Sequence, residues 1–250
     1  MNGEMIMNEI LRSLYERKSV RVFEEREIPQ KEKEQILLAA AMAPTAGNQQ
    51  LYTILDITDP DLKETLSRTC DNQPFIAKAK MVLIFCADCQ KWLDVYRLAG
   101  CSPRDPGPGD LMLAVSDALI AAQNAVCAAE SLGIGSCYIG DIMENCEIHR
   151  EILNLPDLVF PAAMLVFGYP TKQQRERTKP RRAFMDAVVH ANGYHKMEEK
   201  DLNRLMEHNL EGKEFNSWVQ AFHKRKYDSE FAREMNRSVK EYLKSFETSL

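Results

Sequence analysis

Apolar residues recur every three or four positions in some stretches of the chain and form short continuous runs in others, which predicts a mixture of helices and strands. The runs at 81–86 and 162–167 are apolar throughout, as is typical of strands buried on both faces. Asp59 followed by Pro60 predicts a helix start, because Asp caps free N–H groups and Pro fits the first turn. Helices are expected at 5–16, 31–42, from 60 onward, 88–98, 110–132 and 147–153. Strands are expected at 51–58, 81–86, 136–139 and 162–167.

The order of these elements indicates an α+β fold. Strands and helices do not alternate in regular strand–helix–strand units, which argues against a doubly wound sheet. Loops are expected at 100–109, which is rich in Gly and Pro, and at 171–182. Beyond about residue 197 the chain is charged, helical in pattern and without a strand signal. We therefore expect a domain at 1–186 and a helical C-terminal extension at 187–250 that packs on the domain or on a second subunit.

The composition narrows the class of protein. The 250 residues carry a formal net charge of -5, which argues against nucleic acid as the main partner. The seven cysteines are scattered along the chain, so they do not form a disulfide framework and they suit a reducing cytosol. The N-terminal residues also lack the uninterrupted apolar run of a signal peptide. We therefore expect a cytoplasmic protein.

The apolar stretch 110–132 has the length of a membrane span, but its composition favours a buried helix of a soluble protein. It is rich in alanine, and Asp117 and Glu130 are among the polar residues that interrupt it. Such groups are expensive in hydrocarbon, so no membrane partner is expected. Small residues on several sides let other backbones approach closely. This helix is therefore expected at the centre of the fold or at a subunit interface.

Three polar segments are the candidates for chemistry. The first is Arg17-Lys18-Ser19-Val20-Arg21, in a stretch expected to be extended, and its cations would repel one another unless an anion lay between them. The second is Pro44-Thr45-Ala46-Gly47-Asn48-Gln49-Gln50, and the third is Lys179-Pro180-Arg181-Arg182. In an acidic protein, such clusters indicate a bound small anion rather than a nucleic-acid backbone.

These segments, with an alanine-rich helix, AAESLGIGSCYIGD and LVFGYP between the second and the third, resemble the FMN-dependent nitroreductase family over residues 8–186. The resemblance implies a three-layer α+β fold, with a mixed or antiparallel central sheet flanked by helices. It also implies a homodimer that forms through the long central helix and holds FMN at the subunit interface. Members transfer two electrons from NAD(P)H, through the flavin, to nitro compounds, quinones or similar flat acceptors.

The resemblance also implies which residues bind FMN. Segment 17–21 would hold the phosphate, the ribityl chain and the edge of the isoalloxazine ring, and two further cations at 179–181 would bind the phosphate. The segment 44–50 would reach across from the partner subunit, and the turn 138–141 would lie along the flavin. The implied FMN-binding residues are Arg17, Lys18, Ser19, Arg21, Pro44, Thr45, Ala46, Asn48, Gln50, Tyr138, Ile139, Gly140, Asp141, Lys179 and Arg181. The family often has Pro-Trp where this chain has Leu51-Tyr52, and Gly or Glu at the place of Asp141. No catalytic acid or base is expected, because the cofactor carries out the hydride transfer.

Two alternatives stay open at this point. One is a protein that binds or senses FMN without turnover. The other is a thiol oxidoreductase built on Cys86 and Cys89, which form a C-x-x-C at the end of an expected strand, although Asp88 between them would disfavour a thiolate. Neither the remaining cysteines nor the five histidines have metal-ligand spacing, so no metal site is expected.

Overall fold

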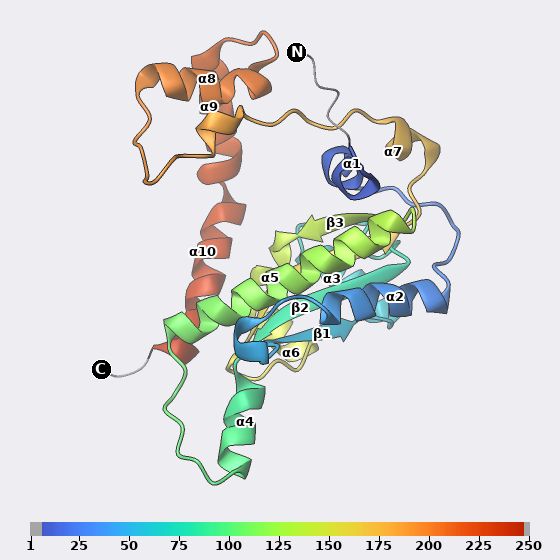
Figure 1. The fold of residues 1–250 in the computed structure, drawn as a ribbon, viewed down its shortest axis with the longest axis vertical. Helices are drawn as coiled ribbons and strands as arrows, with labels where there is room; N and C mark the ends of the chain where they lie inside the picture. Colours follow the sequence, from blue (N-terminus) through green and yellow to red (C-terminus); the bar gives the residue numbers. More distant parts are fainter. Residues whose placement is uncertain (1–6, 248–250) are drawn as a thin grey trace. The chain divides into compact units, whose positions relative to one another are not determined.

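Four strands form one antiparallel sheet in the computed structural model, which describes residues 7–247 (Figure 1). The strands are β1 (Tyr52–Asp56), β2 (Met81–Asp88), β3 (Gly135–Ile139) and β4 (Val159–Gly168). Their order in the sheet is β1-β2-β4-β3, and each neighbouring pair is antiparallel. The expected α+β class with a mixed or antiparallel sheet is confirmed.

Helices lie on both faces of this sheet (Figure 1). The described residues form the helices α1 (Glu9–Glu16), α2 (Gln30–Ala41), α3 (Pro60–Thr69), α4 (Gln90–Leu98), α5 (Pro108–Ser131), α6 (Cys146–Ile152), α7 (Lys172–Glu176), α8 (Glu199–Leu210), α9 (Phe215–Phe222) and α10 (Glu230–Leu243), of which α8 and α9 are part of a separate compact unit. Side chains of β2 alternate between the faces, as a strand requires. Leu83 and Phe85 pack with α2 and α5, whereas Val82 and Ile84 pack with α3, so the fold has three layers.

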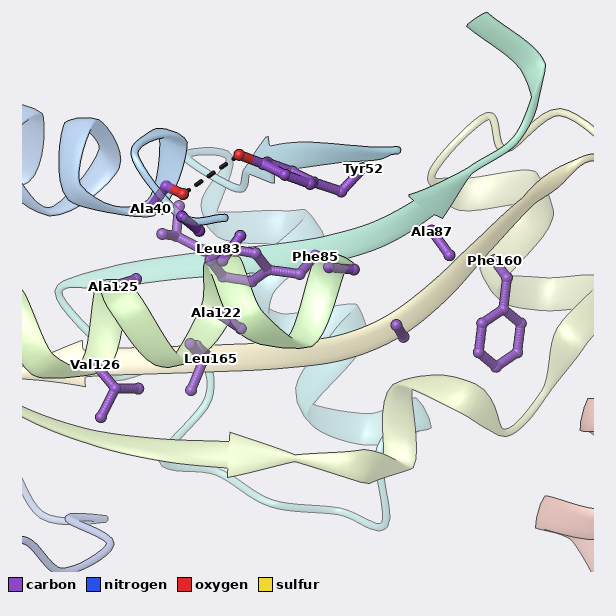
Figure 2. Packing of buried hydrophobic residues seen from close by; sticks show 14 of the residues in the cluster. Ala40, Tyr52, Leu83, Phe85, Ala87, Ala122, Ala125, Val126, Phe160 and Leu165 are labelled. Atoms are coloured by element: carbon purple, nitrogen blue, oxygen red, sulfur yellow. Dashed lines mark hydrogen bonds between the residues drawn. The ribbon is translucent and has the colours of Figure 1, made fainter. Parts of the chain in front are cut away.

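The central helix α5 is buried as expected. Its length and apolar composition would also suit a membrane span, which for a single helix is a weak signal. Its buried face is mostly alanine and contacts α2 and strands β2 and β4. Figure 2 shows Ala122 and Ala125 of this helix beside Leu83 and Phe85, within the cluster where the Tyr52 hydroxyl donates to the Ala40 carbonyl at 3.3 Å. The small side chains therefore allow close packing on the sheet.

Several expected boundaries were wrong, and local capping explains most of the differences. Helix α1 begins at Glu9 because the Asn8 Oδ1 atom accepts from the Leu11 amide at 2.9 Å, and Met5 lies outside the described residues. Helix α5 begins inside the expected loop 100–109, where Asp110 accepts from the Gly107 amide at 2.8 Å. The expected loop at 171–182 contains the short helix α7.

The chain divides into two compact units. One holds residues up to 177 together with 234–247, and the other holds 178–233, with helices α8 and α9. Helix α10 joins the first unit: Tyr242 is fully buried and packs edge-on against Phe160, with ring centroids 5.1 Å apart. The division expected at residue 186 stays a prediction, but most of the last helix belongs with the sheet.

Candidate functional site

The cationic segment 17–21 lies against strand β3. Ser19 and Ser136 form a parallel bridge, and the Val20 amide donates to the Ser136 carbonyl at 2.9 Å. Gly135 permits this approach, because a Cβ at that position would lie 2.5 Å from Cγ2 of Val20. The glycine in the strand therefore fixes where the cations stand relative to the sheet.

Arg17 is the clearest sign of a ligand. Its Nε and Nη2 atoms are buried and have no hydrogen-bond partner among the described residues. Its guanidinium carbon lies 6.0 Å from the ring centroid of Tyr138, whose hydroxyl donates to Oε1 of Gln123 at 3.3 Å. Because buried donors are almost always paired in folded proteins, orphaned guanidinium N–H groups indicate an acceptor that the chain itself does not supply.

Lys18 is partly engaged by the protein. Its Nζ atom donates to the carbonyl of Arg175 at 2.6 Å and to that of Arg177 at 2.5 Å. Arg177 in turn donates from Nη2 to the Ser19 carbonyl at 2.6 Å. An ammonium has three donors, so in the described residues one donor of Lys18 remains for a ligand. Sequence reasoning missed Arg177, which the tertiary fold brings to Ser19 from more than 150 positions away.

Three of the predicted residues of segment 17–21, namely Arg17, Ser19 and Arg21, lie near Cys137 in strand β3. Burial raises the pKa of its thiol, and the nearby Arg21 and Arg17 guanidinium groups and the Ser19 hydroxyl partly offset this rise. The Arg21 guanidinium also lies 5.9 Å from the ring centroid of Phe75. The segment 17–21 and strand β3 therefore form one electropositive site, with Tyr138 at its side.

The segment 44–50 is held by one carboxylate of α5. Asp117 is 3% exposed and accepts from the amides of Ala46 at 3.0 Å and Leu51 at 3.2 Å, and from the Thr45 hydroxyl. Sequence reasoning treated this residue only as a polar interruption of an apolar helix. The sequence signal that could have identified Asp117 is a single carboxylate within an alanine-rich run, because a buried carboxylate needs hydrogen-bond donors.

Within this segment the backbone is turned sharply. Gly47, Asn48 and Gln50 have φ values of 56°, 57° and 50°, in the left-handed region. The Gln50 amide group donates to the Ala41 carbonyl at 3.0 Å and to the Tyr52 hydroxyl at 3.3 Å, so it stabilises the loop itself. Asn48 is exposed, and it is the better placed of the two predicted amides for contact with a ligand.

The predicted turn follows strand β3 directly. Ile139 ends the strand, and Gly140–Met143 form a short 3-10 helix that contains Asp141. Glu144 follows and is 5% exposed, and burial together with the negative charge of Asp141 raises its pKa to about 7. The turn therefore carries negative charge, in contrast to the cations at 17–21.

Lys179 and Arg181 belong to the second compact unit, so their phosphate role stays a prediction. Cys86 and Cys89 are both free and buried, and burial raises the pKa of each thiol to about 12. A thiol of this kind holds little thiolate near neutral pH, which argues against a catalytic dithiol.

Comparison with known proteins identifies the family of this chain. The nitroreductase family model matches residues 14–169. The chain is 31% identical to an FMN reductase [NAD(P)H] of Bacillus subtilis over 86% of this chain and 90% of that protein. It is 35% identical to an oxygen-insensitive NADPH nitroreductase of Salmonella typhimurium, over 76% of each chain. The NfrA1 nitroreductase structure of B. subtilis superimposes with a TM-score of 0.80 at 28% identity, covering 94% of this chain and 98% of that one. The chain therefore belongs to the nitroreductase family.

Proposed function

We propose that this protein is an FMN-dependent oxidoreductase that transfers two electrons from NAD(P)H to nitro compounds, quinones or similar acceptors. The observation that carries the proposal is the pair of buried guanidinium nitrogens of Arg17 beside strand β3, which have no hydrogen-bond partner in the described part of the chain. The relatives support it, because one is named an FMN reductase [NAD(P)H] and another an NADPH nitroreductase.

The residues fit FMN in charge and in donor type. Arg17 and Arg21, with the remaining donor of Lys18, would hold the nearly dianionic phosphate, since guanidinium groups bind such anions in bidentate fashion. Ser19 and Tyr138 would line the same site. When bound, FMN would supply the hydride chemistry, accepting two electrons from the nucleotide and passing them on. The side chains of this chain would bind, orient and shield it.

A homodimer completes the proposal, with segment 44–50 reaching the FMN of the partner subunit. The face of α5 that does not pack on the sheet exposes Met112, Leu119 and Ile120, by 62%, 40% and 40%. On the contacting helix α1, Ile10 is 72% exposed. Contiguous exposed apolar side chains of this kind are typical of an interaction surface. We also propose a cytoplasmic location, which the seven free cysteines support.

The first test is an absorption spectrum of the purified protein, recorded before and after anaerobic addition of NADPH or NADH. We expect flavin bands that bleach within the mixing time and return when menadione is added. Bands that persist with both nucleotides would favour a protein that binds FMN without turnover. A colourless protein that takes up no added FMN would reject the assignment of segment 17–21. Sedimentation at twice the mass of one chain would support the dimer.

A further inference from the structure

We propose that His149 is a positioning residue of the cofactor site: it fixes the turn 140–144 at the edge of the electropositive site, so that the turn is already formed when FMN binds. The identity of the ligand rests on the proposed function, whereas the contacts of His149 are a feature of this chain. His149 lies on α6 and is 0% exposed. A buried imidazole needs hydrogen-bond partners, and these partners show what the residue does.

Both ring nitrogens of His149 are paired. Nδ1 lies 2.9 Å from the carbonyl oxygen of Ile142 in the turn, and Nε2 lies 2.9 Å from Oγ1 of Thr69 at the end of α3. A carbonyl oxygen only accepts, so Nδ1 carries a proton and donates to the turn. Burial lowers the pKa of the imidazole, so the ring is neutral near pH 7 and Nε2 is an acceptor. The ring therefore joins the turn to α3 in one defined tautomer.

Helix α10 holds the same turn through Ser238, which belongs to the same compact unit as the turn and is also 0% exposed. The Ser238 hydroxyl donates to the Met143 carbonyl at 2.7 Å and accepts from the Cys146 amide at 2.9 Å. Consecutive carbonyl groups of the turn, at 142 and 143, are therefore bound by side chains from α6 and α10. This pairing limits the turn to one backbone arrangement.

The junction between the turn and α6 is fixed in the same way. Asn145 has a left-handed φ of 52°, and its side chain donates to the Thr69 carbonyl at 2.9 Å. Its amide donates to the Glu234 carboxylate of α10 at 3.1 Å. Helix α10 thus supplies acceptors for the amides at the start of α6, which a helix cannot satisfy by itself.

The turn lies at the edge of the electropositive site. It begins directly after β3, in which the ring centroid of Tyr138 lies 6.0 Å from the guanidinium carbon of Arg17. Gly140 is two residues beyond Tyr138, so their Cα atoms are at most about 7 Å apart. The chain beyond α3 leads to the same site, because the Arg21 guanidinium lies 5.9 Å from the ring centroid of Phe75. Both segments that His149 joins therefore reach the residues that are proposed to hold FMN.

The turn needs such bonds because negative charge gathers on it. Glu144 is 5% exposed and faces the carboxylates of Asp141, Asp71 and Glu234. Repulsion among these groups favours a more open turn, and the bonds from α6 and α10 oppose it. A turn that is loose before binding must be ordered when a ligand contacts it, which lowers the affinity for that ligand.

The test replaces His149 by residues that each keep one of its two hydrogen bonds. The side-chain NH2 group of Asn takes about the place of Nδ1, and that of Gln takes about the place of Nε2. His149→Asn therefore keeps a donor for the Ile142 carbonyl, whereas His149→Gln keeps only the pair with Thr69. The FMN Kd of the full-length apoprotein is measured by quenching of FMN fluorescence. We expect a Kd within about twofold of the parent protein for His149→Asn and about 10-fold higher for His149→Gln, which corresponds to about 1.4 kcal/mol.

Two further variants separate positioning from a general loss of stability. Ser238→Ala removes the donor to the Met143 carbonyl, so it should also raise the FMN Kd about 10-fold. Ile36→Val removes a methyl group from a fully buried residue of α2, on the other face of the sheet. It should lower the urea unfolding midpoint and leave the FMN Kd unchanged.

The outcomes also separate this proposal from the proposed function. If His149→Asn bound FMN as weakly as His149→Gln, or if both variants kept the Kd of the parent protein, the positioning role would be overturned while FMN binding by the parent stood. If neither variant folds, Ser238→Ala decides, and an unchanged Kd in that variant would overturn the proposal. A parent protein that takes up no FMN would overturn the proposed function and this proposal together.

Discussion

The segments 17–21 and 44–50 are both predicted to bind one cofactor, yet the fold holds them in opposite ways. The first is an extended stretch whose backbone pairs with strand β3, and a glycine at 135 allows it to approach. The second is an irregular loop whose amides and hydroxyl converge on the buried carboxylate of Asp117. The position of 17–21 therefore depends on the missing side chain at Gly135, whereas the position of 44–50 depends on the carboxylate of Asp117.

This difference decides what each segment can offer a ligand. In 17–21 the Val20 amide pairs with strand β3, and the Nε and Nη2 atoms of Arg17 have no hydrogen-bond partner among residues 7–247, so they can bind an anion. In 44–50 the Gln50 amide is used to hold the loop, and the exposed side chain of Asn48 is left for contact. The variants at Asp117, Arg17 and Gly135 that follow should each change one of these segments and leave the other intact.

The largest effect is expected from Asp117→Ala. It would leave the part-buried amide of Ala46, the buried amide of Leu51 and the Thr45 hydroxyl without this acceptor, and each such loss costs about 1–3 kcal/mol. We expect the free energy of unfolding to fall by about 4 kcal/mol, measured by urea denaturation at constant m-value.

The matched control for this variant is Ser116→Ala on the same helix. Its hydroxyl donates only to the Met112 carbonyl one turn earlier, and its side chain is exposed, so stability should change by less than about 0.5 kcal/mol. If Asp117→Ala were as stable as Ser116→Ala, the loop would not depend on this carboxylate.

The sequence predicted the α+β class, most elements and the family, because these follow from local periodicity and from motifs that lie within short stretches. It did not predict the partners that join distant segments. Arg177 reaches Ser19, and Asp117 reaches Leu51, only after the sheet and α5 have packed. A residue pair separated by dozens of positions leaves no mark in the local pattern, so such contacts had to come from the structure.

The second prediction concerns the Arg17 guanidinium. Arg17→Ala should weaken FMN binding about 30-fold, because a hydrogen bond to a charged group contributes about 1.5–3 kcal/mol. The Kd is measured by quenching of FMN fluorescence on binding. The unfolding midpoint without FMN should stay the same or rise, since the two buried nitrogens have no partner in the described chain.

Two comparisons sharpen this prediction. Arg12→Ala removes an exposed cation from the middle of α1 and should leave the FMN Kd unchanged. Arg21→Ala removes an exposed cation of the same segment and should weaken binding less than Arg17→Ala does. An Arg17→Ala protein that binds FMN as tightly as the parent would show that this guanidinium has another function.

A smaller effect is expected when a methyl group is added to strand β3 where the strand meets the cationic segment 17–21. In Gly135→Ala the new Cβ would lie 2.5 Å from Cγ2 of Val20, so 17–21 must shift away from β3. We expect a loss of about 1–2 kcal/mol in stability and a several-fold rise in the FMN Kd. The double variant Gly135→Ala with Val20→Ala should recover part of the FMN affinity. Gly109→Ala, where nothing lies within 4 Å, is the control.

The smallest effect is expected in the pH dependence of stability. It concerns the buried carboxylate of Glu144, whose surroundings differ from those of Asp117. Asp117 has three donors, whereas Glu144 faces the carboxylates of Asp141, Asp71 and Glu234. Burial, followed by these charges, raises the pKa of Glu144 to about 7. In the unfolded chain its pKa is about 4.3, so between about pH 4 and pH 7 the folded state binds more protons, and this residue makes the fold progressively less stable as pH rises toward 7.

Between pH 6 and pH 7 this linkage amounts to about 1 kcal/mol of lost stability, and above about pH 7 the loss levels off. Glu144→Gln removes the ionisable group, so urea unfolding of that variant should lose this share of the pH dependence while the parent protein keeps it. Glu151→Gln, at an exposed position on α6, should leave the profile unchanged. Identical profiles for the parent and Glu144→Gln would mean that water or a shifted side chain stabilises the charged form. In that case Glu144 and Asp117 would differ in their access to solvent and not in the number of hydrogen-bond donors around them.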